Sequence, residues 1–200
     1  ALCSSSAASL NQIYEIDRDA KMKRTRNRPL VKGVIDIKEA LAFGSIAGVG
    51  GTSLLYFGTD IVTASLGFAN IALYSGLYTY LKPRSELNTW VGAVVGAIPP
   101  VMGYSAATGG QDLLSVEAAI LASTLYLWQF PHFFALSWMH RQDYARGGFQ
   151  MVPVNDDING TRTSKLITNY TRYLSTLPIL STALEITTPM FAVEGIALNA

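Results

Sequence analysis

Hydrophobic residues in this chain form long stretches, and most charged residues are confined to the segments between them. The stretches are Ala1–Leu10, Ala40–Phe57, Ile61–Leu81, Trp90–Ala107, Leu114–Met139 and Leu166–Thr187, and another begins near Pro189. A helix of roughly 18 to 25 apolar residues spans a hydrocarbon core of about 30 Å. Because a backbone in lipid must satisfy its own hydrogen bonds, each span is predicted to be a helix. The pattern predicts an all-α, polytopic transmembrane helical bundle with about six spans.

The composition agrees with a membrane protein, since half of the 200 residues are hydrophobic and only 14% are charged. We expect a single integral membrane domain over residues 1–200. The chain opens within an apolar stretch and stops without a polar end, which predicts a fragment with flanking spans missing at both ends. Its single cysteine, Cys3, excludes an internal disulfide framework and a cysteine zinc site. The net charge of +1 indicates no particular partner, and we expect no nucleic acid.

The fifteen Lys and Arg residues fall only in alternate connections between the predicted spans. Residues 11–38 hold eight, residues 82–86 hold two and residues 141–165 hold four, with Arg172 near the same end. Residues 58–60 and 108–112 hold none. If the spans alternate in direction, every basic residue lies on one side of the membrane, as the positive-inside rule describes. The two segments with charged motifs, residues 11–30 and 132–154, are therefore predicted to share that side.

Glycine and proline residues within the spans give two expectations about the helices. Gly44, Gly48 and Gly51 suit the close packing of neighbouring membrane helices. Pro99 and Pro100 lie in mid-span, where the missing backbone donors predict a kinked or broken helix.

The first charged segment carries three oxygen-bearing side chains at helical spacing. Asn11, Glu15 and Asp19 follow one another at every fourth position, so on a helix they lie within an arc of roughly 80°. Asp17 points elsewhere. Such a stripe suits Mg²⁺, which prefers oxygen ligands. It is about 12 Å long, too long for one ion, so a metal bridging to an extended ligand such as a diphosphate is expected.

Basic residues follow this stripe directly. They are Lys21, Lys23, Arg24, Arg26 and Arg28. Carboxylates that hold a metal, followed by cations that hold phosphate oxygens, would suit a metal–diphosphate pair. The same residues would also suit a solvated helix end beside the membrane, where basic anchors are common.

The second charged segment ends the fifth predicted span. His132 follows Pro131 inside the span, where an ionisable group is costly and indicates function, although a histidine packed against a carbonyl group is the alternative. Asp143 lies eleven residues later, near the same stripe if the helix continues. Arg141 and Asp143 would also suit a helix end whose side chains reach towards water.

The two segments together resemble the haem O synthase branch of the intramembrane aromatic prenyltransferase superfamily. The first reads Asn-x-x-x-Glu-x-x-x-Asp followed by Arg-Thr-x-x-Arg-Pro-Leu, and Glu15 stands where many members have Asp. The second reads Trp-Gln-x-Pro-His-Phe-x-Ala-Leu-Ser-Trp-x-x-Arg-x-Asp-Tyr-x-x-Gly-Gly-Phe. The wider superfamily has a second aspartate-rich signature here, of which only Asp143 remains. The resemblance covers nearly the whole chain.

The resemblance implies a helical bundle around a central cavity that opens on one membrane face. It implies transfer of a farnesyl group from farnesyl diphosphate to haem b, giving haem O, with Mg²⁺ as the cofactor. The implied catalytic residues are Asn11, Glu15, Asp19, His132 and Asp143, of which the first three bind the metal. Lys23, Arg24, Arg28 and Arg141 are the implied diphosphate ligands. The lipid bilayer and the downstream haem A synthase are the other expected partners.

The expected compartment is the mitochondrial inner membrane, with a bacterial plasma membrane as the alternative. The basic connections and both motifs would then face the matrix or the cytoplasm. Two other functions remain open at this point. A prenyltransferase for a quinone or chlorophyll precursor would need a second aspartate cluster, and a transporter would place its polar groups near mid-membrane in paired broken helices.

Overall fold

The computed structural model describes residues 1–199, and within that range the chain is helical with no strand. The elements are α1 (Leu2–Asp19), α2 (Ile37–Gly58), α3 (Ile61–Ala72), η1 (Leu73–Tyr78), α4 (Thr79–Leu81), α5 (Asn88–Thr108), α6 (Val116–Met139), α7 (Arg141–Gly147), α8 (Thr161–Ala183) and α9 (Pro189–Asn199). The predicted fold class, an all-α membrane bundle, is confirmed.

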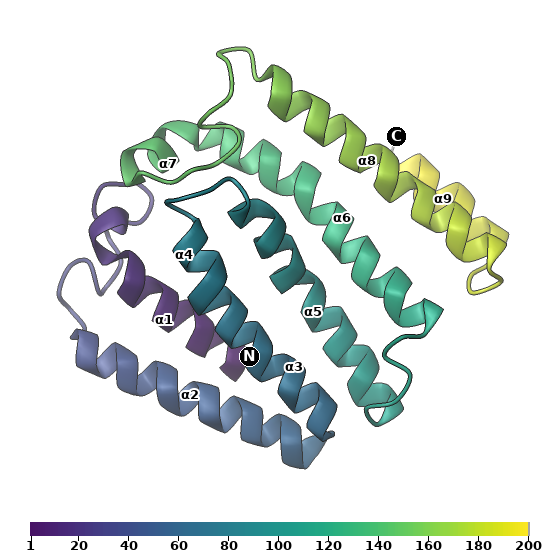
Figure 1. Ribbon diagram of the computed structural model, residues 1–200, viewed down its shortest axis with the longest axis horizontal. Helices are drawn as coiled ribbons and strands as arrows, with labels where there is room; N and C mark the ends of the chain where they lie inside the picture. The colour runs from purple at the N-terminus through teal and green to yellow at the C-terminus, as the bar shows by residue number, and fades with distance from the viewer. Residues whose placement is uncertain (200) are drawn as a thin grey trace.

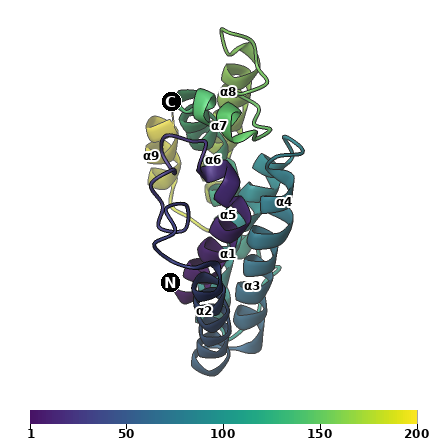
Figure 2. The same ribbon diagram turned by 90° about the vertical axis from the view of Figure 1, so that its left-hand side faces the viewer.

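The long helices lie side by side and alternate in direction (Figure 1). The helix α1 packs on α2, and the span formed by α3, η1 and α4 packs on both α2 and α5. The helices α6, α8 and α9 continue the series, each against its predecessor. Viewed from the side, the arrangement is narrow (Figure 2). The connections α1–α2, α4–α5 and α7–α8 therefore gather at one end of the bundle, which brings the two motif segments together (Figure 1).

Three helices in the described range are long and apolar enough to cross a membrane. They cover Ile37–Gly58, Ile61–Leu81 and Asn88–Thr108. The predicted fifth and sixth spans fold as the long helices α6 and α8, which contain more polar side chains. These apolar spans make the chain an integral membrane protein.

Close contact between α1 and α2 depends on glycine. A Cβ atom at Gly48 would lie 2.7 Å from Oγ of Ser6, and one at Gly51 would lie 2.9 Å from the backbone nitrogen of Cys3. Real Cβ atoms do not approach other atoms this closely, so a side chain at Gly48 would displace the Ser6 hydroxyl, and one at Gly51 would press on the backbone of α1. The predicted packing role is confirmed for both residues. The residues Asn11, Glu15 and Asp19 lie on the other face of α1, so this packing fixes the helix that carries them.

The helix α5 runs through Pro99 and Pro100 without a break. Of the two expectations, the broken helix is wrong and the kink stays a prediction. In a membrane bundle, neighbouring side chains can satisfy the carbonyl groups that proline leaves without donors. The side chain of Gln129 from α6 lies directly against Gly96 and donates a hydrogen bond of 3.0 Å to the carbonyl oxygen of Ala93. This contact lies one turn before the prolines; the carbonyl groups that Pro99 and Pro100 leave without helical donors are those of Val95 and Gly96.

The helix α6 ends at Met139, as the predicted fifth span does, so the condition under which Asp143 would share a stripe with His132 is not met. His140 leaves the helical conformation at φ −104° and ψ 14°, and the chain restarts as the short helix α7. This change of direction carries Asp143 towards the segment after α1, where its carboxylate finds backbone donors.

Candidate active site

The three residues of the predicted stripe share the buried face of α1. The exposed fractions are 4% for Asn11, 3% for Glu15 and 1% for Asp19, whereas Asp17 is exposed. Buried carboxylates at the end of a membrane helix are costly unless cations or hydrogen bonds compensate them. The placement of the stripe on one face is therefore confirmed, and the surrounding residues must supply its compensation.

A polar cavity of about 190 Å³ lies against this stripe, and we call it the acidic cavity. Its wall contains Asn11, Glu15 and Asp19 from α1, the cations Arg24, Arg28 and Lys82, and the phenol rings of Tyr74 and Tyr78. Acidic and basic side chains thus line the same small space. The stripe and Arg28 therefore differ from a solvated helix end, whereas the side chains of Lys21, Lys23 and Arg26 are exposed, as that alternative describes.

Each carboxylate in the acidic cavity has one cation beside it. Lys82 Nζ lies 3.0 Å from Oε1 of Glu15 and 3.3 Å from its Oε2. Arg28 donates to Oδ2 of Asp19, whereas Oδ1 of Asp19 is buried without a hydrogen-bond partner. A buried carboxylate oxygen without a donor is an available ligand for a bound cation.

Lys82 is the main residue that the sequence interpretation missed. The sequence places Lys82 only in a short basic connection. In the structure it follows the last residue of α4 directly, and its side chain is mostly buried. Its ammonium group also lies 4.7 Å from the ring centre of Tyr78 and 5.6 Å from that of Phe149. The available signal was the spacing of Tyr74, Tyr78 and Lys82, four residues apart, which puts them near one face of a helix.

A short π-helix, η1, shapes the wall opposite the acidic stripe. Such turns are rare and often occur at functional sites. The Oγ1 of Thr79 donates to the carbonyl oxygen of Tyr74 at 2.7 Å and accepts from Nδ2 of Asn11 at 2.8 Å. The amide nitrogen of Asn11 thus donates to Thr79, next to the π-helical turn that carries Tyr74 and Tyr78.

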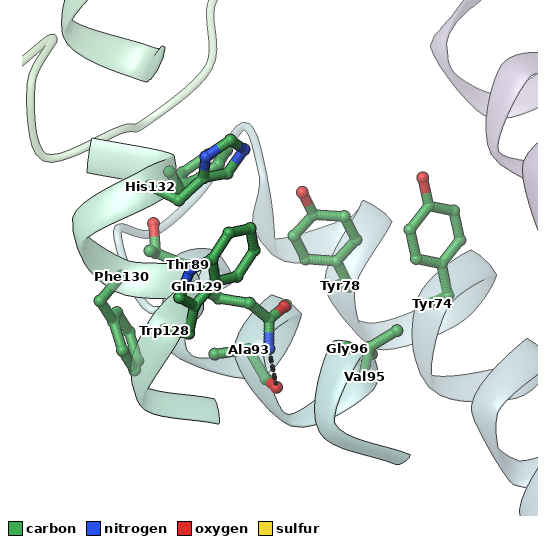
Figure 3. A pocket seen from close by; sticks show the side chains of 12 residues that line it. Tyr74, Tyr78, Thr89, Ala93, Val95, Gly96, Trp128, Gln129, Phe130 and His132 are labelled. Carbon is green, nitrogen blue, oxygen red and sulfur yellow. Dashed lines mark hydrogen bonds between the residues drawn. The ribbon is translucent and has the colours of Figure 1, made fainter. Parts of the chain in front are cut away.

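A second cavity of about 350 Å³ adjoins the first, and we call it the aromatic cavity. Tyr74, Tyr78 and Phe133 line both cavities. Figure 3 shows Tyr74 and Tyr78 on one side of the aromatic cavity and Trp128, Gln129 and His132 on the other. The two cavities together form a polar compartment next to an apolar one.

His132 lies on the wall of the aromatic cavity and not in the acidic one. Its ring stacks on Trp128 with a centroid distance of 4.8 Å and an interplanar angle of 13°. The side chain is largely exposed towards the open side of the cavity. The structure therefore places His132 within reach of a ligand in the apolar compartment, separate from the carboxylates.

Asp143 lies outside the residues that line either cavity. Its Oδ1 accepts a hydrogen bond of 3.2 Å from the backbone N–H of Lys23, and its Oδ2 accepts one of 3.3 Å from that of Arg24. Arg146 Nη2 lies 2.9 Å from Oδ1. Burial raises the pKa of this carboxyl, but the two backbone donors and the positive charges of Arg146 and His140 outweigh it, so the pKa is lower than usual.

Two expected diphosphate ligands also lie outside the acidic cavity. The side chain of Lys23 is exposed. The guanidinium group of Arg141 lies 4.0 Å from the ring centre of Trp138 and donates weakly to its carbonyl oxygen at 3.4 Å. Arg24 and Arg28 are the predicted cations that the structure brings to the stripe.

The donors in the acidic cavity fit a magnesium ion that also binds a diphosphate. No group of three His, Cys, Asp or Glu side chains that could hold a metal by themselves occurs among the described residues. Mg²⁺ usually takes one or two carboxylates and completes its shell with phosphate and water. Glu15 and Asp19 supply two carboxylates, and the free Oδ1 of Asp19 is the best-placed ligand atom.

Comparison with known proteins places this geometry in context. A mitochondrial protoheme IX farnesyltransferase of Homo sapiens is 46% identical over 202 residues, covering 100% of this chain and 44% of the relative. One of Gibberella zeae is 41% identical over 212 residues, covering 99% and 41%. A protoheme IX farnesyltransferase of Solibacter usitatus is 46% identical over 155 residues, covering 78% and 52%. No solved structure is a significant match.

The chain spans about two fifths of the length of the first two relatives. The sequence profile described as the UbiA prenyltransferase family matches residues 1–200, which is the whole chain. The buried carboxylates, their cations and the adjoining aromatic cavity agree with this match. The chain belongs to the UbiA prenyltransferase family.

Proposed function

We propose that this chain carries the prenyl diphosphate site of an enzyme that transfers a farnesyl group from farnesyl diphosphate to the vinyl group of haem b, giving haem O. One observation carries the proposal: two buried carboxylates and three cations share a cavity that adjoins an aromatic one. A ligand with a charged head and an apolar tail fits such a pair of compartments. The names of the similar proteins, protoheme IX farnesyltransferases, support farnesyl and haem as the substrates.

In this proposal the acidic cavity receives the diphosphate. Asn11, Glu15 and Asp19 would hold Mg²⁺, which supplies Lewis-acid chemistry at the leaving group when it is bound. Arg24 and Arg28 contribute positive charge, together with Lys82 in place of the exposed Lys23 and the distant Arg141. Because the cations come from two separate segments, they can approach the diphosphate from two sides.

The cations that compensate the carboxylates also suit the phosphate oxygens. Arg28 and Lys82 lie against Asp19 and Glu15 in this structure. Glu15 and Asp19 would hold the metal, and Arg28 and Lys82 would then pair with the anionic oxygens of the diphosphate. Charge in the cavity stays balanced throughout, so binding does not leave a buried ion without a partner.

The reaction begins with the break of the allylic C–O bond, and its electron pair stays on the diphosphate. Arg24, Arg28 and Lys82 stabilise the negative charge that develops there. The vinyl group of haem b then forms the new C–C bond with C1 of the farnesyl cation. Water adds to the resulting haem cation and loses a proton. The apolar walls of the aromatic cavity keep water away from the first cation.

His132 is the proposed polar contact in the aromatic compartment. Its stacking on Trp128 fixes the ring at the cavity wall. From there it would orient or deprotonate the attacking water, or contact the haem. Arg141 and Arg146 lie at the same end of the bundle, where either could pair with a haem propionate. A His132→Ala variant with full activity would remove this residue from the chemistry.

The membrane setting of the proposal follows from the similar proteins. Two of them are named as mitochondrial, which supports the mitochondrial inner membrane, with a bacterial plasma membrane as the alternative. The motif segments and basic connections would face the matrix or the cytoplasm. Haem O would pass to haem A synthase as the downstream partner.

The test supplies radiolabelled farnesyl diphosphate and Mg²⁺ to the purified full-length protein with either haem b or 4-hydroxybenzoate. We expect label in a haem product and none in the benzoate. Label in the benzoate alone would assign the protein to quinone synthesis. Ion flux in liposomes without any diphosphate binding would point to a transporter and contradict the proposal.

A further inference from the structure

The short helix α7 and the loop that follows it hold the segment after α1 through three kinds of contact. The carboxylate of Asp143 accepts the backbone N–H groups of Lys23 and Arg24. Arg18 Nη1 donates in the other direction, to the carbonyl oxygens of Gly147 at 2.9 Å and Gly148 at 3.2 Å. A buried cluster of Met22, Tyr144, Phe149 and Met151 fills the space between these polar contacts. The two motif segments therefore form one interlocked unit.

Asp143 already has a donor on each of its carboxylate oxygens, and it does not face the acidic cavity. Both carboxylate oxygens accept a backbone hydrogen bond, and Arg146 pairs with Oδ1. The residue does not line the acidic cavity, whereas Asp19 lines it with a buried oxygen that has no partner. The two aspartates thus differ in the property that matters for metal binding, which is an available oxygen facing the cavity.

Helix α7 also positions the side chain of Arg24. The Arg24 guanidinium carbon lies 5.9 Å from the ring centre of Tyr144, the residue that follows Asp143. The backbone of Arg24 and its side chain therefore both contact adjacent residues of α7. From Arg24 the chain turns through Thr25, whose Oγ1 donates to the carbonyl oxygen of Asp19 at 2.9 Å, and reaches Arg28.

We propose that Asp143 is a positioning residue, which holds the backbone at Lys23 and Arg24 so that Arg24 and Arg28 face the diphosphate, and that it is not a metal ligand. This inference rests on the proposed function, because it assigns a role within the same site. It explains how the second motif can contribute with a single aspartate. One carboxylate suffices to fix a two-residue stretch of backbone, whereas a second metal site would need more oxygen ligands.

The first test measures farnesyl diphosphate binding to the purified full-length protein at a series of Mg²⁺ concentrations. For Asp143→Ala we expect farnesyl diphosphate to bind about tenfold more weakly at saturating Mg²⁺, since two charge-assisted hydrogen bonds are lost. The Mg²⁺ concentration at half-saturation should stay as in the wild type. For Asp19→Asn it should rise strongly. Asp17→Asn, which changes an exposed acid on the same helix, is the control.

A second readout needs neither substrate nor activity. Limited trypsin digestion cleaves after Lys23 and Arg24, and it should be faster in Asp143→Ala than in the wild type or in Asp17→Asn. The milder variant Arg146→Gln, which removes only the ion pair, should accelerate cleavage less. The cleavage rate does not depend on which ligand binds the cavity. A failure of the positioning role can therefore be distinguished from a failure of the proposed function.

A double-variant cycle completes the test and also covers loss of folding. If Asp143 acts through Arg24, the binding losses of Asp143→Ala and Arg24→Ala are less than additive in the double variant. Additive losses, unchanged cleavage and an Mg²⁺ requirement raised as in Asp19→Asn would overturn the proposal in favour of a metal ligand. If Asp143→Ala does not fold, Asp143→Asn is the deciding variant, because it keeps the shape of the side chain but replaces one of the two oxygens that accept the backbone N–H groups. Cleavage as slow in Asp143→Asn as in the wild type would contradict the positioning role.

Discussion

The pairing of Lys82 with Glu15 makes the sharpest prediction about stability. The two groups lie 3.0 Å apart, and the exposed fractions of their side chains are 13% and 4%. Unit charges at that distance attract by about 5 kcal/mol at an effective dielectric constant of about 20. Removal of one partner from a buried pair typically costs 3–5 kcal/mol, because the other charge remains buried and unpaired. We expect Lys82→Met to lower the free energy of unfolding by about 3 kcal/mol.

The assay is unfolding of the purified protein by SDS in mixed micelles, followed by tryptophan fluorescence. Arg84→Met is the matched control, because Arg84 is an exposed basic residue two positions away that contacts Tyr80. Adding Glu15→Gln to Lys82→Met should recover most of the loss, since the charge at Glu15 that Lys82→Met leaves buried and unpaired is then removed. Mg²⁺ with diphosphate should also stabilise Lys82→Met, since it supplies a new cation to Glu15. If the double variant is no more stable than Lys82→Met, the paired-charge reasoning is refuted.

Two other predictions concern the helix contact and the positioning carboxylate. Gly51→Ala should destabilise the protein by about 1–3 kcal/mol in the same SDS assay, because its Cβ would overlap the backbone of Cys3, whereas Gly50→Ala has open space and should be neutral. The lowered pKa of Asp143 means that its stabilising hydrogen bonds are complete above the ordinary value of 3.8 and are lost as the pH falls through the lower, folded-state pKa. Hydrogen exchange at the Lys23 and Arg24 amides, corrected for its intrinsic pH dependence, should show protection that disappears only at acid pH. Equal protection at all pH values would contradict this assignment.

Much of the fold followed from the sequence because the membrane limits the choices. Long apolar stretches in lipid must be helices, and the basic residues fall in alternate connections. The helices from α2 to α6 accordingly begin and end within a few residues of the predicted spans. The local spacing of Asn11, Glu15 and Asp19 likewise predicted a shared face, since that depends only on helical geometry.

The remaining features depend on contacts between distant segments, which spacing alone does not encode. Lys82 is one basic residue among fifteen until the fold places it beside Glu15. Asp143 would share a stripe with His132 only on a continuous helix, whereas the turn at His140 directs it to the backbone at Lys23. The α5 helix is continuous through its two prolines, and Gln129 of the neighbouring helix α6 donates to its backbone one turn earlier, a contact that the sequence does not reveal. Each difference has a tertiary cause.

The central claim, that the acidic cavity binds a magnesium–prenyl diphosphate complex, is tested most directly by calorimetry. Farnesyl diphosphate would be titrated into the purified full-length protein with and without Mg²⁺, for the wild type, Asp19→Asn and Asp17→Asn. The account predicts Mg²⁺-dependent binding that Asp17→Asn retains and Asp19→Asn loses. Equal Mg²⁺-dependent binding in all three proteins would contradict this claim. Binding of equal affinity with and without Mg²⁺ would contradict it as well.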